Sequence, residues 1–388
     1  MRYCVHCPIH HYIHRGGRMD SRMLFTAVFA VLLFGCADEA TDEPTGPDVV
    51  LFPYAEWSDS AMVKLNTTES GAGVAGDVTG FPVLLRLHAN VFPSFDSVAS
   101  GGADLRFNTA AGVPMPYEVE YWDDDSIAYV WVLVDTVHGD DSTQFFYMYW
   151  GNLSAVSESD GTAVFAVDNG FQGVWHLEDY TDATARARDA VAKIASTDRT
   201  GMIGRGQLFT EVNGDSLIVE SGANTTNEFT LSGWARTHNV NYQSGSVISV
   251  LWSYDIDADL GYALRVLQSQ IGVITGPPGS WAAKTGCAYP GQWVHVATTF
   301  KNGTLTLYCN GEAVHAVAGQ AFQHSADTWT CIGGSGEANS NTPMDARADL
   351  DEVRESNVAR SGDWIMLSVA NQRDSLGIDA LVSFESIP

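Results

Sequence analysis

The sequence has 388 residues and a formal net charge of −27, because 47 Asp and Glu residues outnumber 20 Lys and Arg residues. A field of this sign repels phosphate backbones and anionic lipid headgroups, which excludes nucleic acid as a partner. Aromatic residues make up 11% of the chain and charged residues 17%, a composition typical of extracellular β-rich proteins and unlike that of disordered chains.

The first eighteen residues contain Cys4, Cys7 and several histidines, a set that superficially resembles a zinc site. We interpret residues 1–18 instead as the product of an upstream start codon, with Met19 or Met23 as the true initiator. A secretory signal follows them, and a segment upstream of a cleaved signal cannot supply a site in the mature protein.

An apolar run of residues 23–34 follows Arg22 and ends at Gly35-Cys36. It is too short to cross the ~30 Å of hydrocarbon in a bilayer. Residues 19–35 therefore have the charged start, apolar middle and small-residue end of a secretory signal. The end of the run, Leu-Phe-Gly-Cys, resembles the lipobox of bacterial lipoproteins. The resemblance implies that Cys36 carries diacylglycerol and becomes the new N-terminus, so that membrane lipid is a partner of the mature protein.

Residues 36–48 are acidic, carry Pro and Gly, and cannot bury apolar area. We expect them to form a flexible spacer between the lipid anchor and the folded protein. Ala37 differs from the aspartate that retains enterobacterial lipoproteins in the inner membrane. We therefore expect an exported protein that is lipid-anchored to the bacterial cell envelope, at the outer membrane.

Short segments between residues 49 and 152 read as strands separated by turns. Most of them alternate apolar and polar residues, and an acidic turn at 123–126 separates two of them as in a hairpin. The expected strands are 61–66, 81–87, 105–107, 117–122, 127–134 and 144–150. This many short strands in ~100 residues predicts an antiparallel β-sandwich.

Four segments of this region resemble, in order, the bacterial domain of unknown function 2341. The matching segments are 81–85, 103–107, 115–120 and 146–152. That family is found on exported and envelope proteins and is often followed by a lectin-like domain, so the resemblance implies an envelope protein with a second domain. Residues 153–170 are the expected connector between the two.

Residues 171–388 form a second strand-rich region with one short helix. Residues 301–303, Lys-Asn-Gly, mark a hairpin, and Ser361 or Asp363 is expected to cap a helix over 363–371. The expected strands are 173–177, 216–219, 229–235, 247–253, 261–268, 292–300, 304–309, 328–332 and 350–354.

Five segments of the second region resemble the laminin-G-like, concanavalin A-like jelly rolls of bacteria. They are 173–177, 229–234, 293–297, 305–311 and 351–361. The resemblance implies two packed antiparallel sheets, and members of this family bind glycans or proteins, commonly with a structural Ca²⁺. The predicted fold is therefore all-β, with two antiparallel β-sandwich domains, of which the C-terminal one is a concanavalin A-like jelly roll.

Asp255, Asp257 and Asp259 offer three carboxylates at alternate positions between two expected strands. Calcium loops use such residues, but Leu260 stands where their glycine is needed, so a solvated hairpin loop is the simpler interpretation. Trp281 is flanked by small and polar residues and is the best candidate for an exposed ring that stacks on a sugar; the alternative is ordinary packing. These four residues are the expected ligand-binding set.

The stretch that contains Asp349, Asp351 and Glu355 is similar to the bulged catalytic strand of laminarinase-type glycosidases. Asp349 replaces the nucleophilic glutamate and is one methylene shorter, so we expect no enzyme. Asp351 is assigned instead to a structural Ca²⁺ site with Glu178 or Asp189, on the basis of charge and oxygen supply.

Three cysteines, Cys287, Cys309 and Cys331, follow the expected lipidation site. An exported compartment permits a disulfide, and Cys309 and Cys331 are its candidates, although both suit buried thiols in strands equally well. Spacing does not give connectivity. The histidines beyond the signal show no metal-ligand spacing, and His176 and His295 are expected to be core or rim residues of strands.

These observations favour a surface-facing recognition protein that binds carbohydrate or another extracellular macromolecule through its lectin-like domain. A structural or adhesive module that binds protein is the second interpretation. A glycoside hydrolase of concanavalin A-like fold is the third and least favoured.

Overall fold

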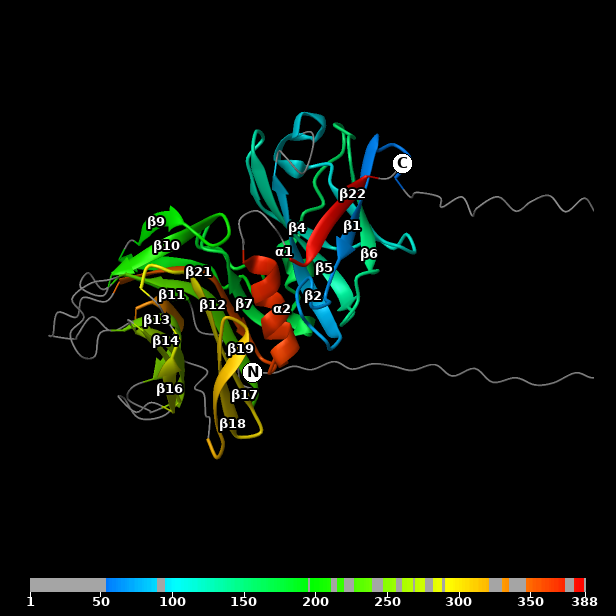
Figure 1. The fold of residues 1–388 in the computed structure, drawn as a ribbon. Coiled ribbons are helices and arrows are strands. Elements are labelled where there is room, and N and C mark those ends of the chain that lie inside the picture. The colour runs from blue at the N-terminus through cyan, green and yellow to red at the C-terminus, as the bar shows by residue number, and fades with distance from the viewer. Residues whose placement is uncertain are drawn as a thin grey trace, which may run out of the picture. The chain divides into compact units, whose positions relative to one another are not determined.

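Two sheets with an apolar layer between them form the N-terminal sandwich in this computed structural model (Figure 1). The four-stranded sheet has the order β22-β1-β6-β3, and the three-stranded sheet has the order β2-β5-β4. Their bounds are β1 (Asp59–Leu65), β2 (Val78–His88), β3 (Arg106–Thr109), β4 (Tyr117–Trp122), β5 (Ile127–Val137), β6 (Phe145–Trp150) and β22 (Val382–Ser386). All pairings are antiparallel, which confirms the predicted sandwich.

The structure describes residues 54–386 with internal gaps. The gaps are 89–94, 195, 211–214, 220–226, 239–246, 256–259, 268, 276–281, 288–289, 321–329, 335–346 and 374–379. Residues 52–388 form one compact unit. Among the described residues, no helix combines the length and the apolar character needed to span a bilayer.

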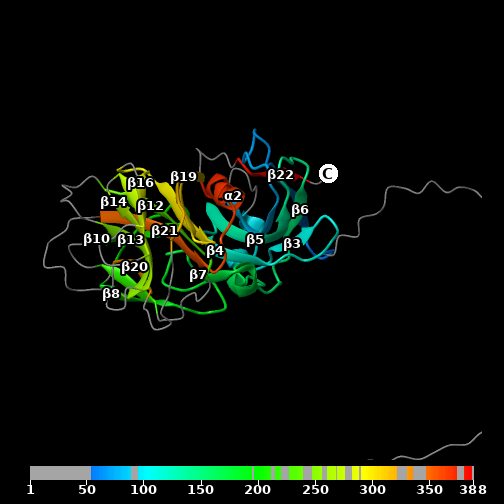
Figure 2. The ribbon, with the colours of Figure 1, turned by 90° about the horizontal axis from the view of Figure 1, so that it is seen from below.

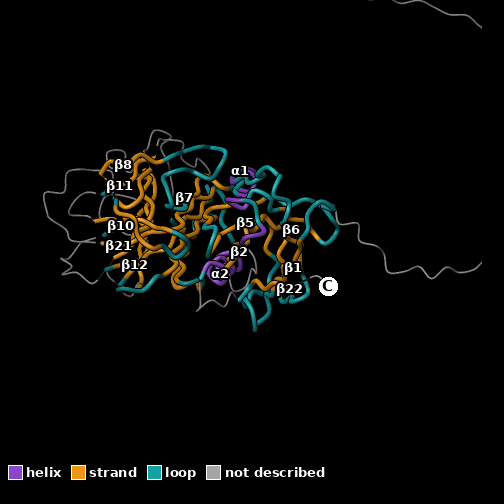
Figure 3. The backbone as a smooth tube through the Cα atoms, turned by 90° about the horizontal axis from the view of Figure 1, so that it is seen from above, coloured by secondary structure: helices purple, strands orange, loops and turns teal. Residues whose placement is uncertain are grey.

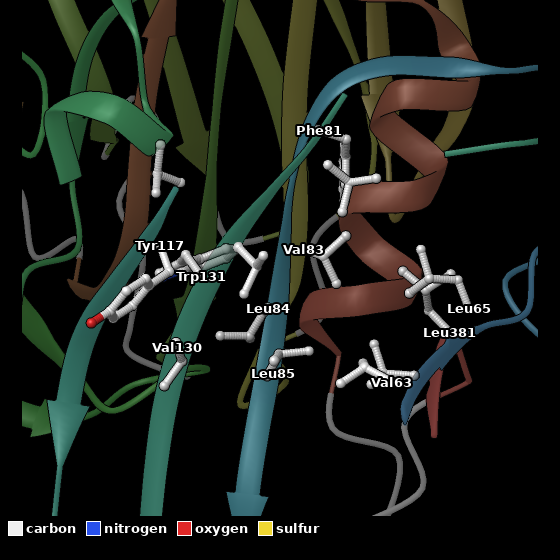
Figure 4. Close-up of a cluster of buried hydrophobic side chains, with 14 of the residues drawn as sticks. Val63, Leu65, Phe81, Val83, Leu84, Leu85, Tyr117, Val130, Trp131 and Leu381 are labelled. Atoms are coloured by element: carbon white, nitrogen blue, oxygen red, sulfur yellow. The ribbon is translucent and has the colours of Figure 1, made fainter. Parts of the chain in front are cut away.

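The core of the first sandwich is made by side chains that alternate along its strands. Val63 and Leu65 of β1 are buried, while Met62 and Lys64 beside them are half-exposed. Residues 81–87 of β2 are buried without alternation, because both faces of this strand are covered. Figure 4 shows this layer with Val83, Leu84 and Leu85 of β2 among the packed side chains.

The last strand, β22, belongs to the first sandwich and not to the second region, where the sequence placed all residues from 171 to 388. It pairs antiparallel with β1, with Phe384 opposite Val63, and Lys64 forms an ion pair with Glu385 at 2.9 Å. The expected domain boundary is therefore wrong at its C-terminal end, because β1 takes its second neighbour from the far end of the chain.

The second region is a sandwich of two larger antiparallel sheets. The eight-stranded sheet has the order β19-β18-β17-β12-β21-β10-β9 with β7 on β21, and the seven-stranded sheet has the order β16-β15-β14-β13-β20-β11-β8. The bounds are β7 (Phe171–Trp175), β8 (Ala190–Ile194), β9 (Thr197–Thr200), β10 (Arg205–Thr210), β11 (Ser216–Val219), β12 (Phe229–Thr237), β13 (Ile248–Asp255), β14 (Leu260–Leu267), β15 (Gln270–Ile274), β16 (Ala283–Gly286), β17 (Val294–Lys301), β18 (Thr304–Cys309), β19 (Glu312–Val317), β20 (Thr330–Gly333) and β21 (Arg347–Ser356).

Rings from both sheets meet in this second core, as Phe229 of β12 lies 4.8 Å from Tyr262 of β14 between ring centroids. The hairpin of β17 and β18 turns at Asn302 and Gly303, both with positive φ, as the sequence predicted. Figure 3 shows that strands and loops dominate the described chain and that α-helix is confined to α1 (Gly161–Val164) and α2.

Helix α2 (Gly362–Gln372) lies between the two sandwiches, against β2 on one side and β19 on the other (Figures 1 and 2). Ser361 caps its start by accepting a bond from the Trp364 N–H. Near its end, the Asn371 side chain bonds to both backbone groups of Leu84 in β2, so it occupies the open edge of that strand. Arg86 donates to the last carbonyls of the helix, a favourable place for a cation.

A disulfide joins Cys287, which follows β16, to Cys309 in β18. The bond therefore connects the seven-stranded sheet to the eight-stranded sheet. Cys331 is a buried thiol in β20. The predicted pair of Cys309 with Cys331 is wrong, because the partner of Cys309 is the cysteine that precedes it in the sequence.

Candidate functional site

A bulge in β21 turns two consecutive acidic residues toward the first sandwich. The pairing with β12 shifts register at Gly233, which faces both Glu352 and Val353. Val353 enters the core between the sheets, so Asp351 and Glu352 share the other face, whereas regular alternation would separate them. Glu352 has a φ of +51°, a conformation that costs a non-glycine residue ~1–3 kcal/mol.

His176, directly after β7, lies among carboxylates from both sandwiches. Its Nδ1 is 2.6 Å from Glu352 Oε1 and 3.4 Å from Glu120 Oε2, and its Nε2 is 3.4 Å from Glu118 Oε2. Glu118 and Glu120 come from β4, where alternate residues share a face. The side chains of Glu120 and Glu352 are 1% exposed and that of His176 is 10% exposed. We call Glu118, Glu120, His176 and Glu352 the acid–histidine cluster.

Burial and neighbouring charges have opposing effects on the pKa values of this cluster. Burial raises the pKa of Glu120 to about 8; His176 opposes the rise and Glu352 adds to it. Burial would lower the pKa of His176, but the surrounding carboxylates outweigh it and hold that pKa well above 6.5. Burial also favours neutral Glu352, yet His176 and Arg354 outweigh it and lower its pKa. The cluster therefore contains a charged His176–Glu352 pair beside a carboxyl group that is largely protonated at neutral pH.

Trp131 and Arg354 support the cluster from its sides. Trp131 Nε1 donates to Glu120 Oε2 at 2.6 Å. Arg354 bonds to the second oxygen of Glu352, and its guanidinium lies 4.5 Å from the Trp131 ring centroid. Both contacts hold a carboxylate in one orientation, as partners outside a ligand shell do in metal sites.

Some polar atoms of the cluster nevertheless lack a hydrogen-bond partner among the described residues. Glu118 Oε2, Glu120 Oε1 and His176 Nε2 are buried and find no hydrogen-bond partner within the described part of the chain. Buried polar groups are paired in the great majority of cases, so each such atom calls for a physical explanation. One ligand atom each from Glu120, His176 and Glu352 lies within 4.8 Å of the other two, which is close enough to hold one metal ion.

Asp351 does not join Glu178 or Asp189, the calcium partners expected from the sequence. Its carboxylate accepts two backbone N–H groups of the turn 201–204, at 2.7 and 2.8 Å. Glu178 pairs with Arg205 at 3.4 Å, and Asp189 accepts a backbone N–H of its own turn. In the described ranges, none of the three belongs to a grouping of metal-ligating side chains. Asp351 and Glu178 accept neighbouring backbone N–H groups at residues 202–205, whereas Asp189 accepts one at residue 182, so the described residues do not bring the expected set together as metal ligands.

The carboxylates of the glycosidase-like stretch do not share one cleft. Asp349 faces away from the core between the sheets and pairs with Arg236 at 2.7 Å. Glu355 lies within that core, where it bonds to Arg188 at 2.8 Å and accepts from the Tyr262 hydroxyl of the opposite sheet. Glycosidases of the retaining type need two carboxyl groups ~5–5.5 Å apart on either side of one bond. The two side chains here point to opposite faces of β21.

The expected ligand-binding residues and the lipidation site fall largely outside the described residues. Cys36, Asp257, Asp259 and Trp281 are among the residues that the structure does not describe. Asp255 ends β13, and its backbone pairs with Leu260 of β14. The predicted hairpin around the acidic loop is thus confirmed, while the role of the loop stays a prediction.

Sequence reasoning missed His176 and Glu120 as site residues. His176 stood in a predicted strand with an apolar neighbour on each side and was interpreted as a core or rim histidine. Glu120 alternated with apolar residues as an ordinary exposed position of a strand would. A signal existed only in the Asp-Glu pair at 351–352, because two adjacent carboxylates in a buried strand require a bulge or partners.

Family comparisons agree with the two-part organisation. Residues 101–182 match the domain of unknown function DUF2341, and residues 211–366 match the concanavalin A-like lectin/glucanases superfamily. The second domain is concanavalin A-like. The order of the two matches is the order that the sequence predicted. No curated protein matches the chain.

Solved structures similar to this chain are distant. The binding domain of botulinum neurotoxin serotype D is 13% identical, with a TM-score of 0.41 and 52% of each chain covered. The binding domain of Paraclostridial Mosquitocidal Protein 1 is 13% identical, with a TM-score of 0.43 and coverage of 53% of this chain and 52% of that one. This chain thus spans about half the length of the structures it matches. At these values the likeness says nothing about ligands.

Proposed function

We propose that the protein is an exported, lipid-anchored recognition protein that binds carbohydrate or another extracellular macromolecule through its concanavalin A-like domain. The observation that carries the proposal is the match of residues 211–366 to a lectin-containing superfamily in a region folded as two packed sheets. The acidic chain, with a net charge of −27, is unsuited to anionic polymers and suits neutral glycans or basic surfaces.

The geometry favours ligand contact at the loops of this domain. One face of the eight-stranded sheet packs on the seven-stranded sheet. The other face carries Trp234, which donates to Gln372 of α2, and Arg354, which stacks on Trp131 of the first sandwich. Because α2 and the first sandwich cover the central part of this second face, we place the binding surface at the loops and on the outer face of the seven-stranded sheet. The loop after Asp255 and the segment around Trp281 adjoin that sheet along the chain.

A glycoside hydrolase is disfavoured by the placement of Asp349 and Glu355 on opposite faces of β21. A structural or adhesive module that binds protein remains the second candidate, because the concanavalin A-like superfamily fold is not itself specific for sugars. Calcium dependence of binding belongs to the proposal through the three aspartates at 255–259.

A glycan array with the purified mature protein tests the recognition function. We expect binding to a defined glycan group that falls at least tenfold on Trp281→Ala, and a chelator arm reports whether the aspartate loop needs Ca²⁺. The matched control is Leu153→Ala, which removes a 66% exposed apolar side chain from the connector. Binding to no glycan, together with saturable binding to an envelope or host protein, would favour the second candidate.

Membrane fractionation and mass spectrometry of the native N-terminus test the anchor. We expect a diacylglyceryl-modified Cys36 and loss of both the modification and membrane association on Cys36→Ser. Cys331→Ser is the control, because that thiol is buried in β20. An unmodified N-terminal Met in cytosolic protein would contradict export.

A further inference from the structure

The acid–histidine cluster lies where β4 of the first sandwich meets β7 and β21 of the second. We propose that Glu120, His176 and Glu352 bind one divalent metal ion of the Zn²⁺ class, and that this ion joins the two sandwiches. This site lies apart from the proposed ligand loops and shares no proposed ligand with the calcium set expected from the sequence.

The ligand geometry is already assembled in the chain. One oxygen of Glu120, one oxygen of Glu352 and a ring nitrogen of His176 lie within 4.8 Å of one another. His176 Nδ1 faces both carboxylates, at 2.6 and 3.4 Å. Metal–ligand bonds of ~2.0–2.2 Å place ligand atoms ~3–3.5 Å apart in a tetrahedral site, so small side-chain movements suffice.

Acidic side chains outnumber basic ones around the site. Carboxyl groups of Glu118, Glu120, Asp351 and Glu352 face it, and the positive groups beside them are His176 and Arg354. Glu120 Oε1 is left without a hydrogen-bond partner in the described structure, although its side chain is 1% exposed. A buried carboxyl oxygen without a partner is costly, and coordination to a metal is one way to compensate it.

The backbone at the site is strained on the side that contributes two ligands. Glu352 has a φ of +51°, and Leu177, the residue after His176, has a φ of +65°. Neither residue is glycine, so each conformation has an energetic cost that surrounding interactions must offset. Both turns serve to aim a ligand side chain toward β4.

The donor set selects among divalent metals. Imidazole nitrogen suits zinc and related transition metals, whereas calcium and magnesium sites are built from oxygens alone. One imidazole and two carboxylates supply three protein ligands, and a four-coordinate Zn²⁺ would have one position left for water. Glu118, 3.4 Å from His176 Nε2, is positioned to accept from the ring N–H that faces away from the metal and so to orient the ring.

Metal analysis of the mature protein tests the proposal. The protein is prepared without a histidine tag and without residues 1–35, so that the cysteines and histidines of the leader cannot bind zinc. After chelation and dialysis, Zn²⁺ is titrated calorimetrically, and Co²⁺ absorption reports on the ligand type. We expect about one ion per chain, bound at least 100-fold more weakly in Glu120→Gln and in His176→Gln.

His295→Gln is the matched control, since it changes another buried histidine of the same sheet outside the cluster. Glu118→Gln leaves the three ligands in place and should weaken binding about tenfold. If the ligand variants do not fold, the anomalous signal of Zn²⁺ in crystals of the unaltered protein decides, with a peak expected between Glu120, His176 and Glu352. Stoichiometric binding that survives both ligand variants, or the absence of any zinc binding by the folded protein, would overturn the proposal.

Discussion

His295 is a buried histidine that the fold keeps uncharged. Its ring lies 5.2 Å from the Trp234 ring between centroids, and its Nδ1 has no hydrogen-bond partner among the described residues. Burial lowers the pKa of His295 to about 3, and the positive charges of Arg354 and Arg373 act in the same direction. The unfolded chain has an ordinary histidine pKa near ~6.5. Between that pH and pH ~3, His295 is therefore protonated in the unfolded chain and neutral in the folded chain.

This difference predicts a specific pH dependence of stability. A depressed pKa in the folded state means that the stabilisation is present above pH ~6.5 and is lost as the pH falls toward ~3. The free energy of unfolding, measured in urea between pH 7 and pH 4, should fall more steeply in the unaltered protein than in His295→Gln. The slopes should differ by up to about 1.4 kcal/mol per pH unit. Equal slopes would show that the pKa of His295 is the same in the folded and the unfolded chain.

The disulfide between Cys287 and Cys309 closes a loop with a sequence separation of 22 residues. Loop closure of this length stabilises a folded domain by about 3 kcal/mol through the unfolded state. The double variant Cys287→Ser/Cys309→Ser should lower the free energy of unfolding by about that amount, measured by chemical denaturation. Reducing agent should lower the stability of the unaltered protein similarly and leave the double variant unchanged; sensitivity of the variant to reductant would contradict the pairing.

Helix α2 is the element that connects the sandwiches, and its start depends on one side chain. Ser361 Oγ accepts from the Trp364 N–H at 3.1 Å, which satisfies a backbone donor that the helix itself cannot pair. Ser361→Ala should lower the free energy of unfolding by about 1 kcal/mol. Ser361→Asp should lower it much less, because an aspartate can also cap the helix. Thermal and urea denaturation of the three proteins measure the effect, and equal losses in both variants would argue against a capping role.

Strand β22 closes one side of the first sandwich, so we expect its removal to lower the stability of the whole molecule. A chain that ends at residue 380 lacks the strand that pairs with β1, together with the buried side chains of Leu381 and Val382. We expect a loss of several kcal/mol, because burial of each such side chain is worth ~1.5–3 kcal/mol. A chain that ends at Ser386 is the control. Differential scanning calorimetry should show the first chain, and not the second, melting at lower temperature.

The sequence predicted most strands of the whole molecule because alternation and turn residues are local signals. Residues 117–122 and 127–134 were recognisable in this way, and so was the start of α2, where Ser361 and Asp363 were the candidate caps and Ser361 is the cap. Partners distant in sequence carried no such signal. Lys64 and Glu385 stand 321 positions apart, and nothing in either segment identifies the other. The same holds for the disulfide.

The acid–histidine cluster shows why a single sequence does not reveal a site of this kind. Glu120, His176 and Glu352 come from three strand regions in two sandwiches, so their spacing in the chain has no regular value. The regular spacing of Asp255 and Asp257 made a site in their loop the easier prediction. Sites assembled between domains depend on packing that a single sequence does not display.

The return of β22 to β1 sets an order for assembly during synthesis. The N-terminal part of a chain is made first, so residues 59–65 are available to fold long before residues 382–386. Throughout that interval one side of β1 offers unpaired backbone groups, which neighbouring chains can use to form intermolecular sheet. Chaperones that cover this early exposed edge, or rapid folding once the tail is made, would therefore limit such pairing.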